Sequence, residues 1–92
     1  MTRLAAKDIA EYREIQLKKQ RSICPLCKTK ILPEEAALDH DHATGHVRMV
    51  LHRSCNSSEG RIIRWAARNR SDDPKEFLRN LLRYWVKDYS SN

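Results

Sequence analysis

The sequence predicts a small α+β domain that a bound metal ion helps to stabilise. Ninety-two residues leave room for one thin apolar core, so we expect residues 1–92 to form a single domain. Helix-forming segments flank a short hairpin pattern. Three cysteines cannot pair off among themselves, and the two-residue gap between Cys24 and Cys27 suits a metal better than disulfides. We divide the domain into segments 1–20, 21–60 and 61–92.

Residues 2–20 are rich in helix formers and predict an amphipathic helix. Its apolar face is expected to hold Leu4, Ala5, Ile9, Tyr12 and Ile15. Prolines 25 and 33 interrupt the pattern, so residues 21–37 should form a knuckle and a connecting loop.

Two short strands are predicted at residues 38–42 and 47–51, with a turn at residues 43–45 between them. In the second strand Val47, Met49 and Leu51 alternate with Arg48 and Val50, which predicts one packed face and one partly solvated face.

Helical periodicity returns at about Ser54 and continues to about Ser71. A last helix should run from Pro74 to about Tyr89, with Asp73 as its N-cap and Glu76 completing a capping box. Its apolar stripe is wide enough for an internal contact and a partner surface, and comprises Phe77, Leu78, Leu81, Leu82, Trp85 and Tyr89. We expect Trp65, Tyr84 and Trp85 to lie in the core or in a dimer interface rather than to stack on bases.

His52 and Cys55 repeat the two-residue gap of Cys24 and Cys27. Two thiolates from one turn and an imidazole with a thiolate from another can complete a tetrahedral Zn²⁺ site. Such a site has no open position, so its role would be structural, and it would supply folding energy that the core lacks. The alternative is a set of reduced thiols in a loop with a surface histidine.

The segment Asp39-His40-Asp41-His42 concentrates two carboxylates and two imidazoles at the end of a strand. Phosphodiester hydrolysis needs this combination: a hard oxygen ligand for a divalent cation and a base that is neutral near pH 7. Strict alternation places the carboxylates and the imidazoles on opposite faces, so they converge only if the strand is twisted or ends here.

Eighteen Lys and Arg against twelve Asp and Glu give a net charge of +6 and favour a polyanionic partner, nucleic acid first. The candidate phosphate contacts are Arg48, Arg53, Arg61, Arg64 and Arg68, although a solvated basic face would also explain them. No apolar run is long enough to span a bilayer, and the N-terminus is too charged for a secretory signal. We expect a cytoplasmic protein without a membrane partner, in the host-cell cytoplasm if it is phage-encoded.

Several ordered motifs together resemble the phage recombination endonuclease VII family of His-Me finger (HNH, or ββα-metal) nucleases. They are Cys24-Pro25-Leu26-Cys27, Leu38 with the DHDH segment, Gly45-His46-Val47-Arg48 and the run from Cys55 to Gly60. The resemblance implies a zinc-stabilised ββα-metal core in residues 21–60 and a helical, dimerising region in residues 61–92. It also implies a DNA endonuclease that resolves branched DNA such as Holliday junctions, or nicks it.

By this resemblance Asp39 and Asn56 would ligate a catalytic Mg²⁺ or another divalent cation, and His40 would be the general base. Glu59 and His42 would assist, or serve solvated and supporting roles, and we expect a structural role for Asp41. Asn56 could instead cap a helix.

Two departures from the family stand out. His52 occupies the position of a zinc-binding cysteine, a substitution that zinc tolerates. Family members also carry a further C-terminal region, which leaves the substrate open: the alternative activities are HNH-type duplex nicking or homing cleavage. A non-catalytic zinc-finger module would explain the charge and the cysteines, but it leaves the DHDH segment without a reason.

Overall fold

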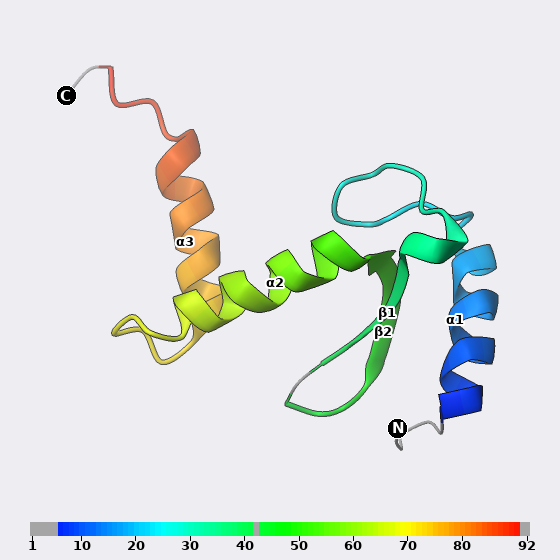
Figure 1. The fold of residues 1–92 in the computed structure, drawn as a ribbon. Helices are drawn as coiled ribbons and strands as arrows, with labels where there is room; N and C mark the ends of the chain where they lie inside the picture. Colours follow the sequence, from blue (N-terminus) through cyan, green and yellow to red (C-terminus); the bar gives the residue numbers. More distant parts are fainter. Residues whose placement is uncertain (1–5, 42, 91–92) are drawn as a thin grey trace. The chain divides into compact units, whose positions relative to one another are not determined.

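The computed structural model describes residues 6–41 and 43–90, which form two compact units, one through Ser57 and one from Ser58. The first unit contains helix α1 (Ala6–Lys19), the 3₁₀ turn η1 (Pro33–Glu35), strands β1 (Ala36–His40) and β2 (Val47–His52) and the start of helix α2 (Arg53–Ala66) (Figure 1). The second contains the rest of α2 and helix α3 (Pro74–Val86). The expected α+β class is confirmed, and the single domain stays a prediction.

Strands β1 and β2 form an antiparallel hairpin, and α1 packs against both of them (Figure 1). The core of the first unit lies here, with buried Cys24, Ile31, Ala36, Val50 and Leu51. It is small, as expected from the length of the chain.

The side of α1 that faces the strands differs from our prediction. Ile9 and Ile15 are exposed, whereas Leu17 packs on the core. The predicted Leu4 and Ala5 lie outside the described residues. Gln20, just after α1, bonds through its side-chain amide to both backbone groups of Val50: its nitrogen donates to the carbonyl at 2.6 Å and its oxygen accepts from the amide at 3.0 Å. This side chain therefore continues the hydrogen bonding of the sheet beyond β2.

The register of the hairpin shifts between Leu38 and His40. Leu38 pairs with Val50, but His40 pairs with Val47, so Arg48 and Met49 together face Asp39. This is a β-bulge with the extra residue in β2. It breaks the alternation that we predicted for β2, and Val50 is buried while Met49 is exposed.

Asp41 organises the turn after β1. Its Oδ1 accepts from the backbone amides of Ala43 and Thr44 at 2.8 and 3.1 Å, and its own amide donates to the His46 carbonyl at 2.8 Å. Gly45 adopts φ 76°, in the left-handed region that glycine adopts without strain. The turn agrees with the structural role expected for Asp41.

Helix α2 ends at Ala66, earlier than we predicted. The side chain of Asn69 donates to the carbonyls of Trp65 and Ala66 at 3.2 and 3.3 Å, which satisfies two of the last helical acceptors. Arg68 therefore lies beyond the helix and does not continue the basic stripe of Arg61 and Arg64 along it.

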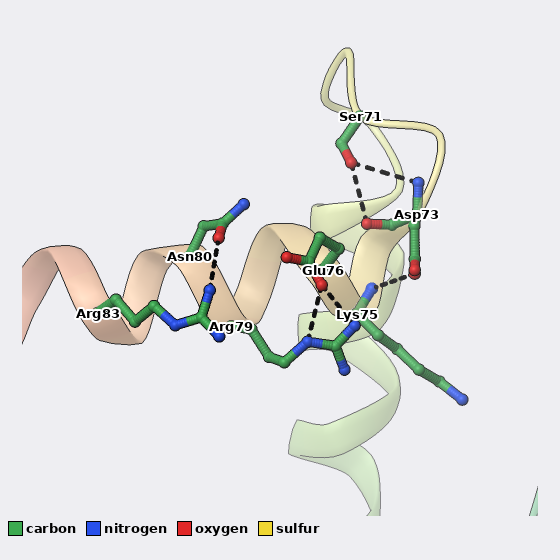
Figure 2. A network of polar contacts seen from close by, with 7 residues as sticks. All are labelled: Ser71, Asp73, Lys75, Glu76, Arg79, Asn80 and Arg83. Atoms are coloured by element: carbon green, nitrogen blue, oxygen red, sulfur yellow. Dashed lines mark hydrogen bonds and ion pairs between the residues drawn. The ribbon is translucent and has the colours of Figure 1, made fainter.

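Helix α3 begins as predicted (Figure 2). The Asp73 carboxylate accepts from the Lys75 amide at 3.0 Å, and Pro74 is the first helical residue. Glu76 does not complete the expected capping box; it accepts from Arg79 Nε at 2.8 Å. The helix ends at Val86, so Tyr89 lies outside it and stacks at a tilt on Tyr84.

None of the helices in the described part of the chain is both long and apolar enough to cross a membrane.

Candidate metal centre and active site

The predicted zinc ligands meet in the first unit. The ligand atoms of Cys24, Cys27, His52 and Cys55 all lie within 4.8 Å of one another. Cys24 and Cys27 come from the knuckle after α1, His52 ends β2, and Cys55 lies in the first turn of α2. Residues 25 to 31 positions apart are therefore brought together by the pairing of the hairpin and by the tight turn of the knuckle.

The knuckle has the geometry of a metal-binding turn. The Lys28 amide donates to the Cys24 carbonyl at 2.8 Å, and the Cys24 amide donates to the Thr29 carbonyl at 2.9 Å. Lys28 adopts φ 64°, which closes the turn at the cost of a left-handed conformation in a non-glycine residue. The Thr29 hydroxyl lies 3.1 Å from the Cys27 sulfur.

His52 is oriented by a contact at each ring nitrogen. Its Nδ1 lies 3.3 Å from the Cys27 sulfur, and its Nε2 lies 2.9 Å from the Lys30 carbonyl. Zinc-binding histidines usually donate their second ring nitrogen to a carbonyl or a carboxylate in this way. The arrangement fits zinc ligation through Nδ1, with Nε2 donating to Lys30.

The charges of the four groups differ before any metal binds. Burial favours the neutral thiol of Cys24, but hydrogen bonds from backbone amides and from His52 outweigh it and lower the pKa of Cys24 to about 6. Hydrogen bonding to Thr29 lowers the pKa of Cys27. The hydrogen bond to Cys24 raises the pKa of His52 to about 9, and burial raises the pKa of Cys55 to about 11.

The cluster therefore combines two thiols with lowered pKa values, Cys24 and Cys27, with a histidine and a third thiol that hold their protons. A cation that takes the place of these protons satisfies all four groups at once, and three sulfurs with one nitrogen are a donor set typical of structural zinc. The Cys₃His cluster could bind zinc.

Asp39 and His40 lie at the end of β1, opposite the bulge in β2, and their side chains differ in exposure. Asp39 is buried, with 5% of its surface exposed, whereas His40 is exposed. The bulge brings Arg48 opposite Asp39, and Arg48 Nε lies 2.6 Å from Asp39 Oδ2. Arg48 is thus an ion-pair partner of Asp39, a contact that we did not predict.

Asn56 is the fourth residue of α2 and is half-buried. Since α2 begins at Arg53, Asn56 lies within the first helical turn and not at the capping position. The helix-cap interpretation of this residue is therefore wrong.

The remaining candidates are distributed over both units. Glu59 is half-buried in the part of α2 that belongs to the second unit, and His42 lies outside the described residues. Arg53, Arg61, Arg64 and Arg68 are all exposed. Trp65, Tyr84 and Trp85 are each more than 60% exposed, so they do not form a core in the described residues.

The fold and the cluster define a small α+β protein in which a knuckle, a β-hairpin and a helix together form a Cys₃His cluster that could bind zinc. Residues 2–87 match the recombination endonuclease VII family, and the chain belongs to that family. Membership supports a DNA endonuclease, with DNA as its substrate. A search of curated proteins finds no match to the chain.

Proposed function

We propose that the protein is a metal-dependent DNA endonuclease of the His-Me finger (HNH) type, with His40 as general base. The observation that carries the proposal is made at the end of β1, opposite the bulge in β2. There the buried carboxylate of Asp39 and the exposed imidazole of His40 are adjacent in sequence. A base must reach a water molecule beside the DNA, which favours the exposed residue for that role.

Asp39 and Asn56 fit the cation in their chemistry. Both offer hard oxygen donors, both belong to the first unit, and Asp39 is buried enough to favour a charged partner. A bound Mg²⁺ supplies stabilisation of the negative charge that develops on the phosphate oxygens. Zinc is assigned to the Cys₃His cluster, where all four positions are filled by the protein.

In the proposed reaction, His40 accepts a proton from the attacking water. A bond forms between the water oxygen and phosphorus, and the bond from phosphorus to the leaving sugar oxygen breaks. That oxygen takes up a proton from solvent. The exposed arginines Arg53, Arg61 and Arg64 contact backbone phosphates and hold the DNA through charge.

Supercoiled plasmid tests the catalytic assignment. With Mg²⁺ and zinc-loaded protein we expect nicking by the wild type and a loss of at least about a hundredfold in rate for His40→Ala, the usual scale of general-base catalysis. His46→Ala is the matched control, because His46 is an exposed histidine in the same hairpin and should nick at the wild-type rate. Equal nicking by the wild type and His40→Ala would remove the catalytic role of His40.

We further propose that the enzyme acts on branched DNA. Family membership supports this substrate class, since the family is that of a recombination endonuclease. A four-way junction and a linear duplex of the same sequence, compared under identical conditions, separate this activity from general duplex nicking. Faster cleavage of the junction is expected, and equal rates would refute the resolving role.

A homodimer through the second unit completes the proposal. There α2 and α3 line an apolar groove of about 480 Å³. Its walls include Ile62, Trp65, Phe77, Leu81, Leu82 and Trp85. Large exposed apolar surfaces on a small protein mark interaction sites, and a second copy would cover this one and supply a second active site for paired cuts.

A further inference from the structure

The pairing of Arg48 with Asp39 raises a question about how a cation reaches this carboxylate. Arg48 Nε lies 2.6 Å from Asp39 Oδ2, and the Asp39 side chain is only 8% exposed. A buried carboxylate needs a nearby positive charge, and in the metal-free protein the guanidinium supplies it. The bulge favours this pairing, because it places Arg48 and Met49 together across from Asp39.

A divalent cation on Asp39 would bring a second positive charge to the same group. Mg²⁺ binds carboxylate oxygens at about 2.1 Å, so it would lie within a few ångströms of the guanidinium if Arg48 kept its position. At such distances the two positive charges repel each other, and burial of Asp39 reduces the screening of this repulsion by water. The ion pair therefore opposes cation binding in the absence of DNA.

The Arg48 side chain is also in contact with solvent. It is 35% exposed, whereas its partner is almost fully covered. Guanidinium groups bind phosphate strongly, often through two parallel hydrogen bonds. A DNA phosphate that approaches the site can therefore bind Arg48 from the solvent side and compensate its charge.

We propose that Arg48 is an exchangeable counterion: it neutralises Asp39 while no DNA is bound and yields the carboxylate to the divalent cation when a DNA phosphate binds the guanidinium. This inference rests on the proposed role of Asp39 as a cation ligand. Cation and DNA then bind with positive cooperativity, and the coupling is reciprocal by thermodynamic linkage. Arg48 acts as a positioning and coupling residue, and the cation site forms fully on DNA.

Titration with Ca²⁺, used as the probe cation, tests this coupling in the zinc-loaded protein with and without a short DNA duplex. For the wild type we expect DNA to strengthen Ca²⁺ binding by at least about tenfold, in the usual range of coupling energies. For Arg48→Gln we expect Ca²⁺ binding without DNA to strengthen about tenfold, and the further gain from DNA to fall below about threefold.

Arg79→Gln is the matched control for the loss of one positive charge. Arg79 pairs with Glu76 in α3, so its substitution also removes an arginine–carboxylate contact, and Ca²⁺ binding should remain as in the wild type. Retained zinc content establishes that each variant is folded. If Arg48→Gln does not fold, the Ca²⁺ titrations of the wild type with and without DNA decide. A Ca²⁺ affinity that DNA leaves unchanged overturns the proposal.

Asp39→Asn separates this inference from the proposed function. Loss of Ca²⁺ binding in Asp39→Asn together with tighter binding in Arg48→Gln supports the exchange. Loss in Asp39→Asn with unchanged or weaker binding in Arg48→Gln refutes the exchange and leaves the proposed cation site in place. Normal Ca²⁺ binding by Asp39→Asn refutes the cation site itself, and the exchange with it.

Discussion

Each ring nitrogen of His52 has its own partner, which fits our expectation that this histidine can take the place of a zinc-binding cysteine. Nδ1 faces the Cys27 sulfur and Nε2 contacts the Lys30 carbonyl. A cysteine could supply the metal ligand but not the second contact. His52 therefore connects β2 to the knuckle in two ways, and the hydrogen bond holds the ring in place for zinc.

The number of protons that zinc binding releases depends on which of the four ligands are protonated beforehand. At pH 7 the thiol of Cys55 (pKa about 11) and the imidazolium of His52 (pKa about 9) carry protons, whereas Cys24 (pKa about 6) is mostly thiolate. Both protonated groups must lose a proton to bind zinc. We expect zinc affinity to fall as pH falls from 9 to 7, with His52 and Cys55 together contributing about two log units per pH unit, and to fall more steeply below 6, where Cys24 also gains a proton.

Competition with a chelator across this pH range measures the slope. The His46→Ala variant should give the same slope, because His46 is exposed and belongs to the hairpin turn. An affinity that does not change with pH would contradict ligation by His52 and Cys55.

At the scale of elements, Gln20 joins the end of α1 to the outer side of β2. Two of its side-chain hydrogen bonds go to Val50, which is fully buried, and a third goes to the Ile23 carbonyl at 2.9 Å. Removal of the amide therefore leaves both buried backbone groups of Val50 without this partner. We expect Gln20→Ala to lower the free energy of unfolding by about 1–3 kcal/mol. Denaturant titration of the zinc-loaded protein measures the loss.

Gln16→Ala is the control for this prediction. Gln16 is also half-buried, but its described side-chain hydrogen bond is a 3.3 Å contact with Gln20. Its substitution should lower the free energy of unfolding by less than about 0.5 kcal/mol, the usual effect at sites without a special contact. Equal losses for the two variants would show that the bonds to Val50 add little.

Helix starts and turns that depend on a few neighbouring residues were predicted from the sequence. Asp73 with Pro74 marked the start of α3, and Gly45 marked the turn of the hairpin. The bulge could not be predicted, since it depends on the pairing of two strands and leaves no mark in either one alone. The sequence pattern also did not predict which side chains of the predicted helix at residues 2–20 meet the strands: Gln20, a polar residue, bonds to Val50, while Ile9 and Ile15 are exposed.

The candidate site, like the fold, was predictable where it depends on local spacing and not where it depends on strand pairing. The repeated two-residue spacing predicted all four members of the Cys₃His cluster, because short spacings survive as local geometry. The partnership of Asp39 with Arg48 depends on register across the hairpin, so the sequence predicted Arg48 as a DNA contact but not as a partner of the carboxylate. Asn56 lies in the predicted helix, but only the observed start of α2 at Arg53 shows that it is not the capping residue.

On the scale of the whole molecule, the two units carry different chemistry. The first holds the Cys₃His cluster and the Asp39–Arg48 pair, and the second holds the apolar groove between α2 and α3. A net charge of +6 suits the chain to DNA. In the proposed function, catalysis belongs to the first unit and association of two copies to the second.

Leu82 and Val86 test the proposed dimer as a matched pair in α3. Leu82 lines the groove, whereas Val86 is 82% exposed and does not line it. Because a leucine side chain is worth about 1.5–3 kcal/mol when buried, Leu82→Ser should weaken self-association roughly tenfold or more. Val86→Ser should leave it unchanged. Sedimentation equilibrium measures both constants, and a wild type that stays monomeric at all concentrations would refute the dimer.

The most direct test of the account is the position of a divalent cation in a crystal of the zinc-loaded protein with DNA. Mn²⁺ can be located by its anomalous scattering. The account predicts Mn²⁺ bound by oxygens of Asp39 and Asn56 at about 2.1–2.2 Å, against a DNA phosphate and beside His40, with zinc held separately by the four cluster residues. Mn²⁺ bound elsewhere, or Asp39 and Asn56 directed away from a shared cation, would contradict it.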